Sequence, residues 1–67
     1  MVEVEFDCGF IWLADQLEKH IGPRKFYLHN RIGGEGWDVR PAYKGYSRTI
    51  ARFDDPKMAT FIQLKIP

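Results

Sequence analysis

The chain of 67 residues has the length of one small domain, and 45% of its residues are hydrophobic, enough for a thin core. Ten Lys and Arg against nine Asp and Glu leave a formal charge of +1, far below that of a typical nucleic-acid-binding module. The single cysteine excludes an internal disulfide, and no stretch reaches the roughly 20 apolar residues that span a bilayer. We therefore expect one domain over residues 1–67, without membrane contact and located in the cytoplasm.

The charges are unevenly distributed along the chain. Residues 1–22 carry five acidic and one basic side chain, residues 23–52 carry seven basic and two acidic, and the remainder is neutral. Two interpretations stay open. Either the acidic first segment neutralises a basic sheet within the molecule, or the basic segment forms a functional face.

The first third of the chain predicts a strand followed by a helix. Apolar and acidic residues alternate over residues 2–6, as in a half-buried strand. An apolar helix face then recurs at spacings of three and four: Phe10, Leu13, Ala14, Leu17 and Ile21. Asp7 is expected to cap this helix, and Gly22, followed by Pro23, to end it in the left-handed conformation.

The middle of the chain predicts a hairpin. Lys25 to Asn30 and Trp37 to Arg40 have extended patterns, and the glycine-rich segment Ile32 to Gly36 between them is expected to be a flexible tip. Pro41 ends the second strand or places it near an edge.

A polar loop over residues 42–47 and a strand over residues 48–53 lead to the last element. Asp54-Asp55-Pro56 is a helix start signal, with a capping carboxylate before a proline. Helical spacing then follows at Met58, Phe61, Ile62, Lys65 and Ile66. A strand is the alternative, because Ile62, Leu64 and Ile66 also alternate with polar residues; the start signal favours the helix. We expect a small α+β domain of order β-α-β-β-β-α, an antiparallel sheet with both helices on one face.

No pattern predicts catalysis, a metal site or a cofactor. Cys8 at a strand-to-helix turn could be activated by the helix N-terminus, but His20 lies about 18 Å along that helix and only His29 is left as a base. A buried, inert cysteine is the simpler interpretation. The glycine cluster lacks the lysine and hydroxyl residue of a phosphate loop. We therefore expect a protein that is not an enzyme.

The basic and aromatic segment is the candidate binding surface. Its proposed contact residues are Arg31, Trp37, Arg40, Tyr43, Lys44, Tyr46 and Arg48. These residue types are favoured at protein interfaces, so a protein partner is expected. Two alternatives stay open: a single-stranded nucleic-acid site, in which rings stack on bases, and self-association as part of a virion.

The stretch from Ile50 to Lys65, a strand ending in Phe53 and acidic residues and followed by a helix, resembles the tail of short uncharacterised bacteriophage proteins. The chain departs from that pattern in ending with Ile66-Pro67. The resemblance implies a phage-encoded protein in the cytoplasm of its host, acting as an inhibitor or modulator of a host enzyme or defence complex.

Overall fold

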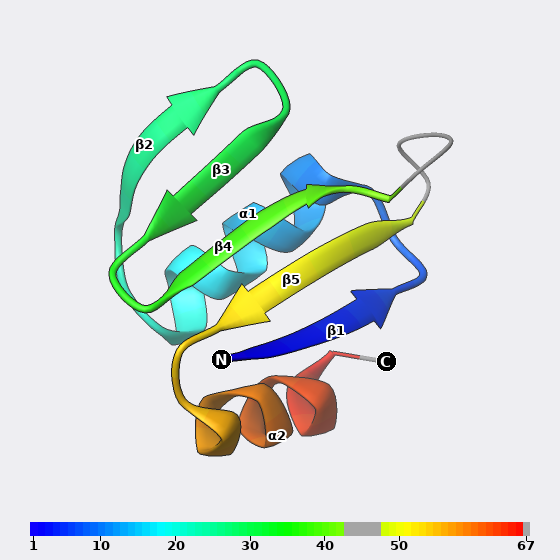
Figure 1. The fold of residues 1–67 in the computed structure, drawn as a ribbon, viewed down its shortest axis with the longest axis vertical. Helices are drawn as coiled ribbons and strands as arrows, with labels where there is room; N and C mark the ends of the chain where they lie inside the picture. The colour runs from blue at the N-terminus through cyan, green and yellow to red at the C-terminus, as the bar shows by residue number, and fades with distance from the viewer. Residues whose placement is uncertain (43–47, 67) are drawn as a thin grey trace.

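One antiparallel sheet carries two helices (Figure 1). The structure, a computed structural model, describes residues 1–42 and 48–66. Within these residues the elements are β1 (Val2–Phe6), α1 (Phe10–His20), β2 (Arg24–Leu28), β3 (Arg31–Gly34), β4 (Trp37–Pro41), β5 (Thr49–Phe53) and α2 (Pro56–Lys65).

The sheet has the strand order β1-β5-β4-β3-β2, so that β1 and β2 form its two edges. All neighbouring strands run antiparallel. Helix α1 packs on β3, β4 and β5, and α2 packs on β1 and β5. The predicted α+β class, with an antiparallel sheet and two helices, is confirmed.

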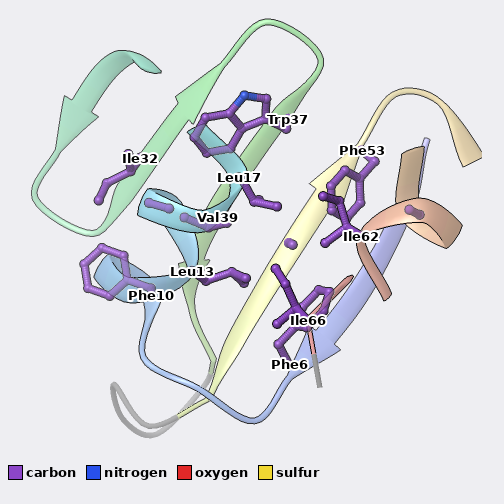
Figure 2. Close-up of a cluster of buried hydrophobic side chains, with 13 residues drawn as sticks. Phe6, Phe10, Leu13, Leu17, Ile32, Trp37, Val39, Phe53, Ile62 and Ile66 are labelled. Carbon is purple, nitrogen blue, oxygen red and sulfur yellow. The ribbon is translucent and has the colours of Figure 1, made fainter. Parts of the chain in front are cut away.

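The core lies between this sheet and the helices. Trp37 and Val39 of β4 alternate with polar residues, and their register partners on β5 are Phe53 and Ala51. Figure 2 shows Leu13 and Leu17 entering this cluster from α1, and Ile62 approaching Phe53 from α2. Because both helices meet the same set of strand side chains, they cover one face of the sheet. We call the opposite face the open face.

The predicted flexible hairpin tip is wrong. Residues 31–34 form β3, a strand between two turns, and not a loop. Two glycines sit in this strand because rings lie against them: a Cβ atom on Gly33 would lie 2.5 Å from the Phe26 ring, and one on Gly34 would lie 2.7 Å from the Trp37 indole nitrogen. The glycines therefore serve close packing, whereas their composition indicated a loop.

The helix ends agree with the sequence at one helix only. At α1, Gly9 is the N-cap residue in place of Asp7, and Ile21 is the C-cap residue, whose N–H donates to the Leu17 carbonyl at 2.8 Å. Gly22 is not left-handed, since Gly36 has the only positive φ (83°) among the described glycines. At α2, by contrast, the Asp55 side chain accepts from the Lys57 N–H at 2.9 Å, as the start signal predicts. The final segment is thus a helix, and the strand alternative is excluded.

Candidate interaction surfaces

The structure separates the residues predicted to form the contact surface. The prediction that Trp37 belongs to the contact surface is wrong. Its side chain is fully buried against the helices, because it lies on the core side of β4. The three arginines of the set, Arg31, Arg40 and Arg48, are partly or largely exposed. Tyr43, Lys44 and Tyr46 lie outside the described residues.

The acidic first strand neutralises two of those arginines. The Arg40 guanidinium lies 3.1 Å from the Glu3 carboxylate, and that of Arg48 lies 3.1 Å from Glu5. Arg40 belongs to β4, so its side chain reaches across β5 to the edge strand β1. Of the two interpretations of the uneven charge, neutralisation within the molecule is the one that these contacts support.

A buried carboxylate holds the third arginine. The Asp38 side chain is 3% exposed and lies 3.0 Å from the Arg31 guanidinium. Arg52 Nε lies 3.3 Å from both Asp38 oxygens and donates a hydrogen bond to Oδ2. Burial acts to lower the pKa of Arg52, but the attraction of Asp38 and Asp54 outweighs it and the pKa is raised. Over β1, β3, β4 and β5 the open face is therefore a network of paired charges.

A second surface, which the sequence did not single out, lies at the opposite edge of the sheet. Three consecutive large residues of β2 are exposed: Phe26, Tyr27 at 59% and Leu28 at 57%. Because side chains alternate along a strand, Phe26 and Leu28 lie on the open face and Tyr27 on the helix side. The edge strand β2 thus presents apolar side chains on both faces of the sheet.

The helix side of β2 is hollowed. A shallow groove of about 440 Å³ runs between β2 and the start of α1, and its lining includes Ile11, Trp12, Tyr27 and His29. Ile11 and Trp12 are each about half exposed. We call the group Ile11, Trp12, Phe26, Tyr27 and Leu28 the β2 surface.

Ion pairs fix α1 beside β2. Arg24, the first residue of β2, binds both Asp15 and Glu18 of α1, with 2.9 Å between its Nη2 and Glu18 Oε1. The hydrogen bonds from Arg24 lower the pKa of Glu18, and the same bonds raise the pKa of Arg24. The two walls of the groove, α1 and β2, are therefore held together at the start of β2.

Two features of the sequence could have indicated this surface. Ile11 and Trp12 are large apolar residues at positions outside the spacing of the buried helix face. Phe26-Tyr27-Leu28 breaks the alternation of apolar and polar residues that a half-buried strand shows. Both features signal apolar side chains without a place in the core.

Cys8 is not arranged as a nucleophile. Burial, and to a smaller extent the charge of Asp7, raise the pKa of its thiol, the reverse of the activation considered from the sequence. The Thr49 hydroxyl donates to the Cys8 carbonyl at 2.7 Å, a contact that ties the turn after β1 to β5. Among residues 1–42 and 48–66, no group of three His, Cys, Asp or Glu side chains is placed to hold a metal ion.

Comparison of the chain with protein-family models, with curated proteins and with solved structures found no match. In the part of the chain that the structure describes, no helix has the length and apolar character needed to cross a membrane. The fold and the two surfaces define the molecule as a small α+β domain with one charge-matched face and one apolar edge.

Proposed function

We propose that the protein is a non-catalytic protein-binding module and that another polypeptide chain binds at the β2 surface. The observation that carries this proposal is the exposure of Phe26, Tyr27 and Leu28 on a strand that ends the sheet. Such a strand offers unpaired backbone N–H and C=O groups, and proteins normally protect it with charges. Here apolar side chains accompany the free edge.

The other edge of the same sheet has no such run of exposed apolar side chains, since apolar and acidic residues alternate along β1. The exposed side chains of β1 include Glu3 and Glu5, each in an ion pair. The β2 surface comprises five large side chains, each between a third and two thirds exposed, so that its area is on the order of 500 Å². Apolar side chains on both faces beside a free strand edge fit an extended polypeptide that pairs with β2.

The nucleic-acid alternative has less support. A site for single strands needs cations that are free to neutralise phosphates, whereas Arg31, Arg40 and Arg48 each face a carboxylate. The phage origin and a host enzyme or defence complex as partner stay predictions that follow from the resemblance of the C-terminal segment.

Site-specific photo-crosslinking tests the proposal. A photoreactive residue replaces Leu28 in one variant and Leu64, an 81% exposed leucine on α2, in the matched control. In the cells that naturally produce the protein, we expect a discrete protein adduct from position 28 and none from position 64. Absence of an adduct at position 28, or equal adducts at both positions, would contradict the proposal.

A further inference from the structure

The β2 surface fits a second copy of the same chain. We infer that two copies pair antiparallel through β2, about a twofold axis at Tyr27, and so join their sheets into one. This inference rests on the proposed function, since it names the polypeptide that the β2 surface binds.

The hairpin register shows which backbone groups of β2 are available. Leu28 and Arg31 flank a two-residue turn, so they form a hydrogen-bonded pair, and the next pair, Tyr27 and Ile32, does not. The second hairpin agrees: Gly34 and Trp37 flank its turn, which places Ile32 in a hydrogen-bonded pair with Val39. The N–H and C=O of Tyr27 therefore point away from β3, toward the free edge.

This geometry sets the register of the pairing. A twofold axis at Tyr27 lets its N–H and C=O exchange hydrogen bonds with those of Tyr27 of the second copy. Phe26 then lies opposite Leu28 of the second copy, and Leu28 opposite its Phe26. One strand supplies both halves of two aromatic–aliphatic contacts, which makes β2 complementary to itself.

Both faces of the edge become covered in the same step. On the helix side, Tyr27 meets Tyr27 of the second copy beside the groove walls formed by Ile11 and Trp12. The roughly 500 Å² of the β2 surface on each copy would give about 1,000 Å² in a dimer, the lower bound for a specific interface.

The charges on β2 do not oppose this pairing. Arg24 is bound to Asp15 and Glu18, and Lys25 lies 3.1 Å from the Glu35 carboxylate. Both cations of the strand are therefore paired within their own copy. The edge lacks the uncompensated lysine with which natural edge strands prevent association.

Sedimentation equilibrium across a concentration series tests the inference with two matched variants. The wild-type protein should show a reversible monomer–dimer equilibrium. Leu28→Lys should raise the dimer Kd by about 100-fold, because a symmetric interface loses the contact twice. Leu64→Lys makes the same chemical change on α2 and should leave the Kd unchanged. A wild-type monomer at all concentrations, or equal effects of the two variants, would overturn the inference.

A disulfide experiment tests the register independently of the Leu28→Lys variant. In a Cys8→Ser background, Tyr27→Cys should form a covalent dimer on mild oxidation, since the Cα atoms of such a pair lie about 5.5 Å apart. Leu64→Cys in the same background should not. If the protein is monomeric and position 28 still crosslinks to a different protein, the bound chain is not a second copy. The proposed function would then still hold. No dimer and no adduct of any kind would overturn both.

Discussion

The open face and the β2 surface show opposite solutions for a sheet that two short helices only partly cover. On the open face, arginines from three strands lie against carboxylates of β1, β4 and the segment after β5. On the β2 surface, large apolar side chains are exposed beside a free backbone edge. A charged face can thus have its charges paired within the molecule, while an edge with exposed apolar side chains is the surface in need of a partner. Whether side chains have partners within the molecule, more than their residue type, decides whether their surface is available for binding.

Breaking the charge network at its centre should have the largest effect on stability. Asp38→Ala leaves Arg31 and the partly buried Arg52 without their shared carboxylate, so we expect the free energy of unfolding to fall by about 3 kcal/mol. Urea denaturation of the dilute protein measures it. A loss below about 1 kcal/mol would show that the network contributes no more to stability than ordinary exposed ion pairs do.

Gly33 lies between Asp38 of the charge network and Phe26 of the β2 surface. Its substitution should have the next largest effect on stability. The Cβ atom of Gly33→Ala would lie 2.7 Å from the Asp38 Cβ as well as against the Phe26 ring. We expect a loss of roughly 2 kcal/mol and a shift of the Phe26 ring, visible in the chemical shifts of its protons. Gly22→Ala is the control, since nothing lies within 4 Å of its Cβ position. Equal stability of the two variants would contradict the close packing of Phe26 on β3.

The outer ion pairs of the open face should contribute little singly. Glu3→Gln removes the partner of Arg40 at a largely exposed site, so we expect a loss below about 1 kcal/mol that shrinks as salt rises. The same urea titrations at low and high ionic strength measure it. A loss as large as that of Asp38→Ala would contradict the distinction between the buried centre and the exposed rim.

The smallest expected effect concerns pH. The pKa of Glu18 is lowered in the folded protein by the hydrogen bonds from Arg24, below its ordinary value of 4.5. Its contribution to stability is therefore present above pH 4.5 and is lost as the pH falls through the folded pKa. Glu18→Gln should flatten this acid limb of the stability curve. An unchanged limb would mean that the Arg24 contact does not hold α1 to β2 in solution.

The sequence predicted the layers of the fold well and the surfaces poorly. Helix spacing and the Asp55 cap are local signals, and the elements they predict exist. The strand β3 was missed because Gly33 and Gly34 are explained by the rings of Phe26 and Trp37, contacts that no local pattern contains. The burial of Trp37 escapes the sequence for a different reason, since aromatic residues are common both in cores and at interfaces. The uneven charge was visible, but its neutralisation depends on β5 lying between β1 and β4.

The most direct measurement compares the two edges of the sheet in one experiment. Amide hydrogen exchange, followed by NMR at low and high protein concentration, reports on each backbone N–H separately. We expect the outward N–H of Tyr27 to exchange rapidly in dilute protein and to become protected as concentration rises, while the amides of β1 stay unchanged. Protection that grows at β1 or across the open face, with Tyr27 unaffected, would contradict the assignment of the β2 surface as the contact site.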